Sequence, residues 1–136
     1  MRAVLIDAGP LVALLDQSDN RHQEVVEVLE QIRDPLVSVW PVLVEAMYLL
    51  AFSWRAQKAL WEILETGAVQ LLPLDADDIP HLKSLMEKYR DLPMDMADAA
   101  LVRVAEREGL RRVFTLDRRD FTVYQLARKG GLTLLP

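Results

Sequence analysis

Short apolar runs alternate with longer helical segments along the chain, and this alternation is the feature that most constrains the fold. Such runs are typical of short buried strands, and the segments between them have the spacing of helices. We predict strands at 3–6, 36–39, 69–72, 112–116 and 132–135. We predict helices at about 10–16, 21–33, 41–53, 55–66 and 76–90, then a helix that carries Asp98 and ends at Gly109, and a short one at 121–128. Strands that alternate with helices indicate an α/β sandwich around a short, mainly parallel central sheet.

Local signals place several helix ends. Asn20 is expected to cap the second helix, and Asp120 the last one. Pro41 suits a first helical turn, and Gly67 suits the residue just after a helix.

Composition limits the classes of protein to consider. A chain of 136 residues, 51% hydrophobic and 27% charged, is expected to form one globular domain over residues 1–136. The absence of cysteine excludes disulfides, thiolate catalysis and thiolate zinc sites. No apolar run approaches the roughly 20 residues of a membrane span, and Asp7 comes too early for a signal peptide, so we expect a cytoplasmic protein.

The net charge of −5 argues against the broad basic surface of a dedicated nucleic-acid binder. It leaves room for a local basic rim around an acidic cleft. Pairs of cations at Arg111-Arg112, Arg118-Arg119 and Arg128-Lys129 are candidates for such a rim, although solvated surface is their more common role.

Asp7, Glu45, Asp98 and Asp117 stand where the chain is otherwise apolar. An ionised carboxylate in apolar surroundings must be paired, hydrogen-bonded or bound to a metal, or else take up a proton. Asp7 and Asp117 follow predicted strands, and ligands bind at the carboxyl ends of the strands in such sheets. The four acids are therefore candidates for a shared cation site.

Each acid also has an ordinary structural explanation, and the explanations differ in strength. Asp7 suits a helix cap, Asp95 and Asp98 have cap and third-position spacing in one helix, and Asp117 suits a turn. Glu45 is the least easily explained, because its helix carries no other charge from Pro41 to Ser53. We therefore expect Glu45 to be buried and to need a partner.

A cluster of carboxylates favours Mg²⁺ or Mn²⁺ over zinc, since the chain has no cysteine and only two histidines. Such a site deprotonates water and stabilises the charge that develops on a phosphoryl group. Metal-assisted hydrolysis of a phosphate ester is the reaction that these residues indicate. His22 and His81 have no partner at metal-ligand spacing and are expected on the surface.

The chain resembles the PIN-domain ribonucleases, particularly the VapC-type toxins of toxin–antitoxin pairs. The resemblance runs from Leu5-Ile6-Asp7, through the mid-helix Glu45 and the Asp95-Met96-Ala97-Asp98-Ala99 segment, to the block at 115–121. By this similarity Asp7, Glu45, Asp98 and Asp117 match the acidic quartet of the family, with Asp7 and Asp98 as the principal metal ligands. Asp95 and Asp120 resemble accessory acids, and Thr115 matches a hydroxyl residue beside the site.

The resemblance implies a PIN-like α/β/α sandwich and a Mg²⁺-dependent endoribonuclease, with Mn²⁺ as a substitute, that leaves a 5′-phosphate on the cleaved RNA. It also implies a homodimer and a cognate antitoxin that covers the acidic cleft. One departure is that Ala8 and Gly9 stand where many members of the family have a Ser or Thr. By the resemblance, the position of an auxiliary hydrogen bond that orients water or phosphate is the one that this departure affects, and its effect on activity stays open.

Two other interpretations remain open from the sequence. An aspartyl-phosphate phosphatase would use Asp7 as nucleophile, but such sites need a second acid two residues later, where this chain has Gly9. A PIN-like interaction module without catalysis would use the acids to bind arginines of a partner. Trp54 and Trp61 share one helical face and fit core packing and an interface equally well.

Overall fold

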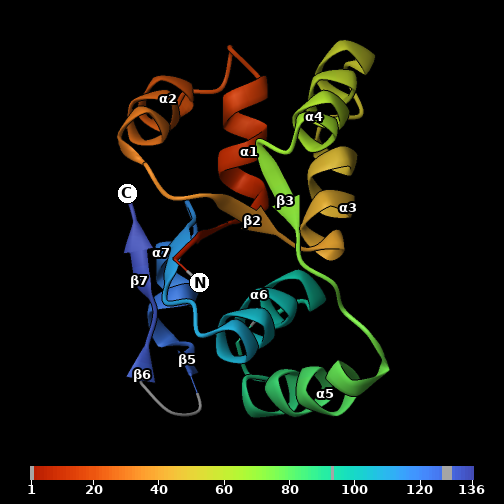
Figure 1. The fold of residues 1–136 in the computed structure, drawn as a ribbon, viewed down its shortest axis with the longest axis vertical. Helices are drawn as coiled ribbons and strands as arrows, with labels where there is room; N and C mark the ends of the chain where they lie inside the picture. Colours follow the sequence, from red (N-terminus) through yellow and green to blue (C-terminus); the bar gives the residue numbers. More distant parts are fainter. Residues whose placement is uncertain (1, 93, 127–129) are drawn as a thin grey trace.

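A computed structural model describes residues 2–92, 94–126 and 130–136 of the chain and shows an α/β sandwich (Figure 1). Within these residues a central sheet has the strand order β3-β2-β1-β4-β7, and every neighbouring pair is parallel. The strands are β1 (Val4–Ile6), β2 (Leu36–Ser38), β3 (Val69–Leu71), β4 (Arg112–Phe114) and β7 (Thr133–Leu135). The predicted fold class and its parallel sheet are confirmed.

Helices connect these strands and cover the sheet. In Figure 1, α1, α2 and α4 lie together on one side of the strands, and α5 and α6 lie on the other. Helix α3 contacts both α1 and α6. The helices are α1 (Ala8–Leu15), α2 (His22–Gln31), α3 (Trp40–Leu49), α4 (Trp54–Thr66), α5 (Ile79–Lys88), α6 (Met96–Glu108) and α7 (Arg118–Val123), with a short 3-10 helix η1 (Ala76–Asp78). A small antiparallel pair, β5 (Gln125–Leu126) and β6 (Gly130–Gly131), precedes β7.

The strand order creates a switch point beside β1. From β1 the chain first builds outward to β2 and β3, and it then returns to add β4 and β7 on the other side of β1. The connections on the two sides of β1 therefore diverge, and in open α/β sheets ligands bind in the crevice that such a divergence leaves at the carboxyl ends of the strands. Val4, Leu5 and Ile6 of β1 are completely buried, as expected for a strand covered on both faces.

One predicted helix start and one predicted helix cap are wrong, because neighbouring aspartates control the backbone there. Helix α1 begins at Ala8 rather than near residue 10, since the Asp7 carboxylate accepts a hydrogen bond from the Ala8 backbone N–H. Asn20 does not cap α2. Asp19 organises that turn, its carboxylate accepting from the Arg21 N–H and its carbonyl from the His22 N–H.

The last predicted helix is displaced toward the N-terminus. It spans Arg118–Val123 instead of 121–128, because the Asp117 carboxylate accepts from the Asp120 N–H and caps it. Asp120 is therefore in the first turn and is not the cap. The predicted positions 127 and 128, like Lys129 of the third basic pair and Pro93, lie outside the described residues.

Other predicted ends agree with the structure. Gly67 and Gly109 follow α4 and α6 with positive φ angles of 80° and 69°, which glycine adopts without steric cost. Pro41 lies at the second position of α3. Among the described residues, no helix combines the length and the apolar character that a membrane crossing requires.

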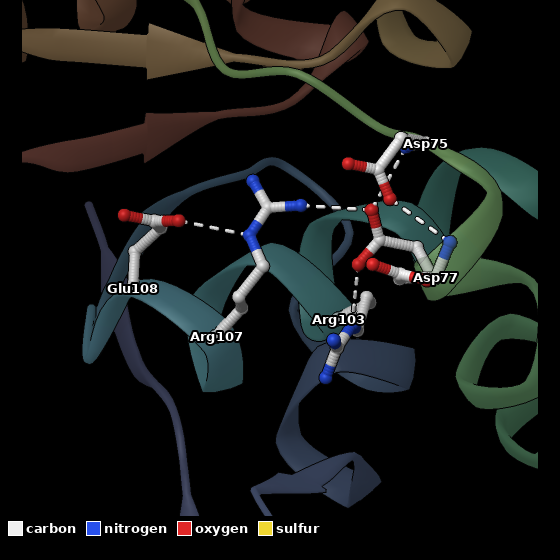
Figure 2. A network of polar contacts seen from close by, with 6 residues as sticks. Asp75, Asp77, Arg103, Arg107 and Glu108 are labelled. Atoms are coloured by element: carbon white, nitrogen blue, oxygen red, sulfur yellow. Dashed lines mark hydrogen bonds and ion pairs between the residues drawn. The ribbon is translucent and has the colours of Figure 1, made fainter.

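A buried ionic network fastens η1 and α5 to α6 (Figure 2). The Asp78 carboxylate is almost completely buried and accepts from Arg103 Nε at 2.7 Å and from Arg107 Nη1 at 2.9 Å. It also accepts from the Asp75 backbone N–H at 3.0 Å, and Arg107 pairs in addition with Glu108. Both arginines belong to α6, so the network fixes the helix that also carries Asp98.

Candidate active site

Acidic side chains from separate parts of the chain converge at the carboxyl edge of the sheet. They line a cavity of about 440 Å³, which we call the acidic pocket. Its lining residues are Asp7, Ala8, Gly9, Glu45, Leu49, Asp95, Asp98, Leu116 and Asp117. The whole quartet and the accessory acid Asp95 therefore meet at the switch point between β1 and β4. Asp120 and Thr115 do not line the cavity, although both contact residues that do.

Asp7 is the most rigidly held of these acids. It directly follows β1, and its backbone N–H donates to the Phe114 carbonyl of β4 at 2.9 Å. Its Oδ1 accepts from the Ala8 N–H at 2.8 Å and its Oδ2 from the Thr115 hydroxyl at 2.9 Å. Asp7 therefore caps α1, as its position suggests, and the same carboxylate also faces the cavity.

Asp95 and Asp98 form the start of α6. Asp95 is the cap, and its Oδ1 accepts from the Asp98 backbone N–H at 2.8 Å. Asp98 is in the first helical turn, where the helix dipole favours a negative charge. The predicted cap spacing is confirmed, and it places two carboxylates on one side of the cavity.

Glu45 reaches the cavity from α3, but the prediction that it is buried is wrong. Its side chain is only partly buried, because its helix lies at the surface and exposes the neighbouring side chains Val44, Tyr48 and Leu49. The apolar composition of this helix was interpreted as burial, but it reflects an apolar surface that α3 exposes.

Asp117 approaches from the segment after β4. Its backbone N–H donates to Thr115 Oγ1 at 2.9 Å, and its own carboxylate caps α7 through the Asp120 N–H. Thr115 is completely buried and links this segment to Asp7. The turn expected at Asp117 is therefore a helix cap.

Burial and mutual repulsion make several carboxylates of the acidic pocket hard to ionise. Burial raises the pKa of Asp98 to about 7, with a further contribution from the charge of Asp95. Burial is also the main reason why the pKa values of Asp7, Glu45 and Asp117 lie above their ordinary values, and nearby carboxylates add to all three. A cation in the pocket would relieve this repulsion.

None of the described residues that line the pocket carries a positive charge that could do so. Arginines and lysines of the described residues form their ion pairs elsewhere, and none of these pairs includes an acid of the pocket. The donors are all oxygens, which suits Mg²⁺ or Mn²⁺.

The spacing of the acids narrows the kind of metal site further. No three acidic or histidine side chains of the described residues already form a cage that could hold a metal. Mg²⁺ does not require such a cage, since it usually keeps several waters and binds one or two carboxylates together with substrate phosphates. The residues of the pocket fit a magnesium ion by donor type and by charge.

One residue of the site escaped the sequence analysis. Tyr124, which is completely buried just after α7, donates a hydrogen bond from its hydroxyl to Asp98 Oδ2 at 3.0 Å. No spacing rule links a tyrosine to an acid 26 residues earlier, so only the fold reveals this contact.

The remaining landmarks lie away from the pocket. His22 Nδ1 lies 2.7 Å from the Ala13 carbonyl, and His81 is exposed. Trp54 and Trp61 are both exposed on α4, which favours an interface over core packing.

Comparisons with known proteins agree with this geometry. A family model described as PIN domain matches residues 4–129. Ribonuclease VapC26 from Mycobacterium tuberculosis (strain ATCC 25618 / H37Rv) is 33% identical over 135 residues, which cover 98% of this chain and 100% of that protein. The crystal structure of M. tuberculosis VapC20, described as a Sarcin-Ricin loop cleaving toxin, aligns with a TM-score of 0.78 and 19% identity over 85% of this chain and 91% of that one. A toxin–antitoxin complex from Klebsiella pneumoniae aligns with a TM-score of 0.65 and 18% identity over 88% and 91%.

Proposed function

Because the chain belongs to the PIN-domain family, and within it to the VapC-type proteins, we propose that it is a Mg²⁺-dependent endoribonuclease and the toxin of a toxin–antitoxin pair. The observation that carries this proposal is the acidic pocket itself. Four carboxylates from four separate segments, Asp7, Glu45, Asp98 and Asp117, converge there without a cationic partner among the described residues. A protein maintains such repulsion at a cost in stability, and functional sites are where such costs are found.

The residues have different roles in this proposal. Asp7 and Asp98 are the principal metal ligands, because each is buried and held by hydrogen bonds on the cavity wall. Glu45 and Asp117 complete the acidic pocket, and their less enclosed side chains orient the attacking water.

The supporting residues hold these acids in place. Asp95 fixes the backbone at Asp98, and Thr115 fixes Asp7. Asp120 lies in the first turn of α7 and contacts Asp117 through its backbone N–H.

A divalent ion held by Asp7 and Asp98 would supply the activation of water and the positive charge that offsets the charge developing on the phosphate. The chain contributes the placement of these groups. The acids of the pocket would orient the water that attacks the phosphorus, and cleavage of the bond from phosphorus to the 3′-oxygen leaves a 5′-phosphate and a 3′-hydroxyl. A mainly acidic chain binds RNA weakly by charge alone, so selectivity then depends on the shape of the target.

RNA cleavage by the pure protein tests the proposal. We expect cleavage in Mg²⁺ or Mn²⁺, none in EDTA, and products that carry a 5′-phosphate. Asp7→Asn and Asp98→Asn should each reduce the rate by at least 100-fold, roughly the loss that follows removal of an essential charged group. Asp77→Asn, at an exposed acid outside the pocket, is the matched control and should cleave normally. Undiminished cleavage by both pocket variants would refute the assignment, and metal-insensitive partner binding without any cleavage would indicate an interaction module.

Partners are the second part of the proposal. Helix α3 and the segment after it expose Trp40, Val44, Tyr48 and Phe52, and Leu49 joins this surface to the acidic pocket. Contiguous exposed apolar side chains of this kind mark interaction sites. We propose that the chain forms a homodimer in the cytoplasm and that an antitoxin covers the pocket.

A single substitution tests the role of this surface. Tyr48 is 79% exposed, so Tyr48→Glu should leave the fold intact while it weakens association. Light scattering of the pure protein measures the homodimer, and co-purification with the protein encoded by the adjacent gene, the expected antitoxin, measures the second contact. An unchanged molecular mass and unchanged co-purification would exclude this surface from the dimer contact and from the antitoxin contact.

A further inference from the structure

Tyr124 and Asp98 form a buried contact that the proposed reaction does not yet use. The Tyr124 hydroxyl donates to Asp98 Oδ2 at 3.0 Å, and the tyrosine has no exposed surface. A buried phenol needs a hydrogen-bond partner, but many carbonyl groups would serve that need. Here the partner is a carboxylate of the acidic pocket.

The ring of Tyr124 is held from two sides, so its hydroxyl has little freedom. Phe121 packs edge-on against it, with centroids 5.1 Å apart and an interplanar angle of 75°. Tyr89, at the end of α5, packs at 5.1 Å and 60°. Such tilted pairs are the favoured geometry of aromatic contacts. Contacts with α7 and with the end of α5 thus fix the ring that carries this hydroxyl group.

The contact determines how Asp98 presents itself to the cavity. Its backbone is fixed by the bond from its N–H to Asp95, and its Oδ2 is occupied by Tyr124. No side-chain hydrogen bond among the described residues engages its Oδ1, which is therefore the oxygen that the carboxylate offers to a ligand. Because tyrosine is a neutral donor, it orients the carboxylate without cancelling its charge, as an arginine would.

The same arrangement occurs at Asp7, which also lines the pocket. There the buried Thr115 hydroxyl, also neutral, donates to Oδ2. The two acids proposed as principal metal ligands are therefore the two that each receive one buried hydroxyl. Ligating carboxylates commonly have such outer partners, which set their orientation.

We propose that Tyr124 is a positioning residue that holds Asp98 in the orientation needed to bind the divalent ion. This inference rests on the proposed metal-dependent function. It predicts that the hydroxyl of Tyr124 contributes to metal affinity, whereas its ring contributes to folding.

Calorimetric titration of Mn²⁺ into the full chain separates these contributions. Tyr124→Phe removes only the hydroxyl, and it should raise the Kd for Mn²⁺ about tenfold, the lower end of the effect of losing an outer-shell partner. Phe121→Leu disturbs the same ring cluster but keeps the hydroxyl, so it should lower the melting temperature while it raises the Kd less than Tyr124→Phe does. Equal Kd values for Tyr124→Phe and the native chain would overturn the inference. A native chain that binds neither Mn²⁺ nor Mg²⁺ would instead overturn the proposed function.

Fluorine NMR observes Tyr124 in the native chain, so its result does not depend on the stability of a variant. The chain contains three tyrosines, Tyr48, Tyr89 and Tyr124, so labelling with 3-fluorotyrosine yields three resonances. The Tyr124 resonance, assigned by its loss in Tyr124→Phe, should shift on titration with Mg²⁺ with the same Kd as calorimetry, and the exposed Tyr48 should not. A Tyr124 resonance that stays fixed while calorimetry shows binding would contradict the positioning role.

Discussion

The Thr115 hydroxyl donates to Asp7 Oδ2 at 2.9 Å, across 108 residues of sequence, and accepts from the Asp117 backbone N–H at the same distance. One buried side chain thus connects the ends of β1 and β4, the two strands that flank the switch point of the sheet. This bond fixes Asp7, which also caps α1. The same hydrogen bond therefore stabilises the fold and positions a side chain of the acidic pocket.

Thr115→Val should therefore affect both stability and activity. Valine has nearly the same shape, but it leaves a buried carboxylate oxygen and the Asp117 N–H without their partner. We expect a loss of about 1–3 kcal/mol in the free energy of unfolding, the cost of unsatisfied buried groups. We also expect a fall in RNA cleavage of roughly tenfold or more. Chemical denaturation and cleavage assays measure the two effects.

The same substitution on the adjacent strand is the control. Thr133 lies exposed on β7, where valine is well suited to a strand, so Thr133→Val should change stability by less than about 0.5 kcal/mol. Thr115→Ser keeps the hydroxyl and should retain most of the activity. Equal effects of Thr115→Val and Thr115→Ser would assign the loss to packing and not to the hydrogen bond.

The sequence was sufficient to predict the sheet and the convergence of the acids. Asp7 and Asp117 follow short apolar runs, and parallel strands bring their carboxyl ends to one edge. The cap spacing of Asp95 and Asp98 is local, so it too is visible in the sequence. Sequence patterns predict these features because they depend on interactions within a few residues or on the regular geometry of a parallel sheet.

Contacts between distant segments were not predictable in this way. The bond from Tyr124 to Asp98 depends on how the chain between α7 and β5 returns to α6. The exposure of Glu45 depends on what covers α3. The sequence of an apolar helix does not distinguish a helix buried in the core from one that faces a partner. At the start of α2 the cap expected at Asn20 does not form, because the Asp19 carboxylate accepts from the Arg21 N–H and organises the turn instead.

The metal-free protein should lose stability as the pH rises. The pKa of Asp98 is raised from an ordinary value of 3.8 to about 7, chiefly by burial, so the folded state holds its proton longer than the unfolded state does. The contribution of Asp98 to the free energy of unfolding is therefore fully present below about pH 4, and it is lost progressively as the pH rises to about 7. At about 1.4 kcal/mol per pKa unit the loss amounts to several kcal/mol at most. Urea denaturation in EDTA between pH 4.5 and 8 measures it.

Asp98→Asn supplies the comparison for this pH dependence. Asparagine cannot ionise, so the variant should show a flatter profile and should be more stable than the native chain at pH 8 in EDTA. Added Mg²⁺ should restore stability to the native chain only. A native profile that is flat from pH 4.5 to 8 would show that Asp98 is not held protonated.

The contribution of Asp78 to stability should depend on pH in the opposite direction, because its negative charge is paired with two arginines. Burial alone would raise the pKa of Asp78, but the Asp75 backbone N–H together with Arg103 and Arg107 outweighs burial and lowers the pKa to about 2. Its contribution is therefore present above about pH 4 and is lost as the pH falls toward 2. Asp78→Asn leaves two arginines without their counter-charge and should cost about 3 kcal/mol at pH 7, measured by denaturation.

The neighbouring residue provides a matched control for the network. Asp77→Asn makes the same chemical change at an exposed position one residue away and should alter stability by less than about 0.5 kcal/mol. A loss equal to that of Asp78→Asn would mean that the charge of the short helix, rather than the ionic network of Figure 2, is responsible.

Gly9→Ser should raise activity, since it returns a hydroxyl to the wall of the acidic pocket at one of the two positions where this chain departs from the family. The fold accepts the change. A Cβ at Gly9 would lie 3.4 Å from Leu116 Cβ, an ordinary contact, and serine is about 0.5 kcal/mol better than glycine within a helix. We expect cleavage to increase several-fold at saturating Mg²⁺, together with a slightly higher melting temperature. Gly9→Ala is the control, because it brings the gain in helix stability without the hydroxyl. If the alanine and serine variants cleave RNA at the same rate, the hydroxyl has no part in positioning water or phosphate, and the departure at Ala8 and Gly9 is neutral for the reaction.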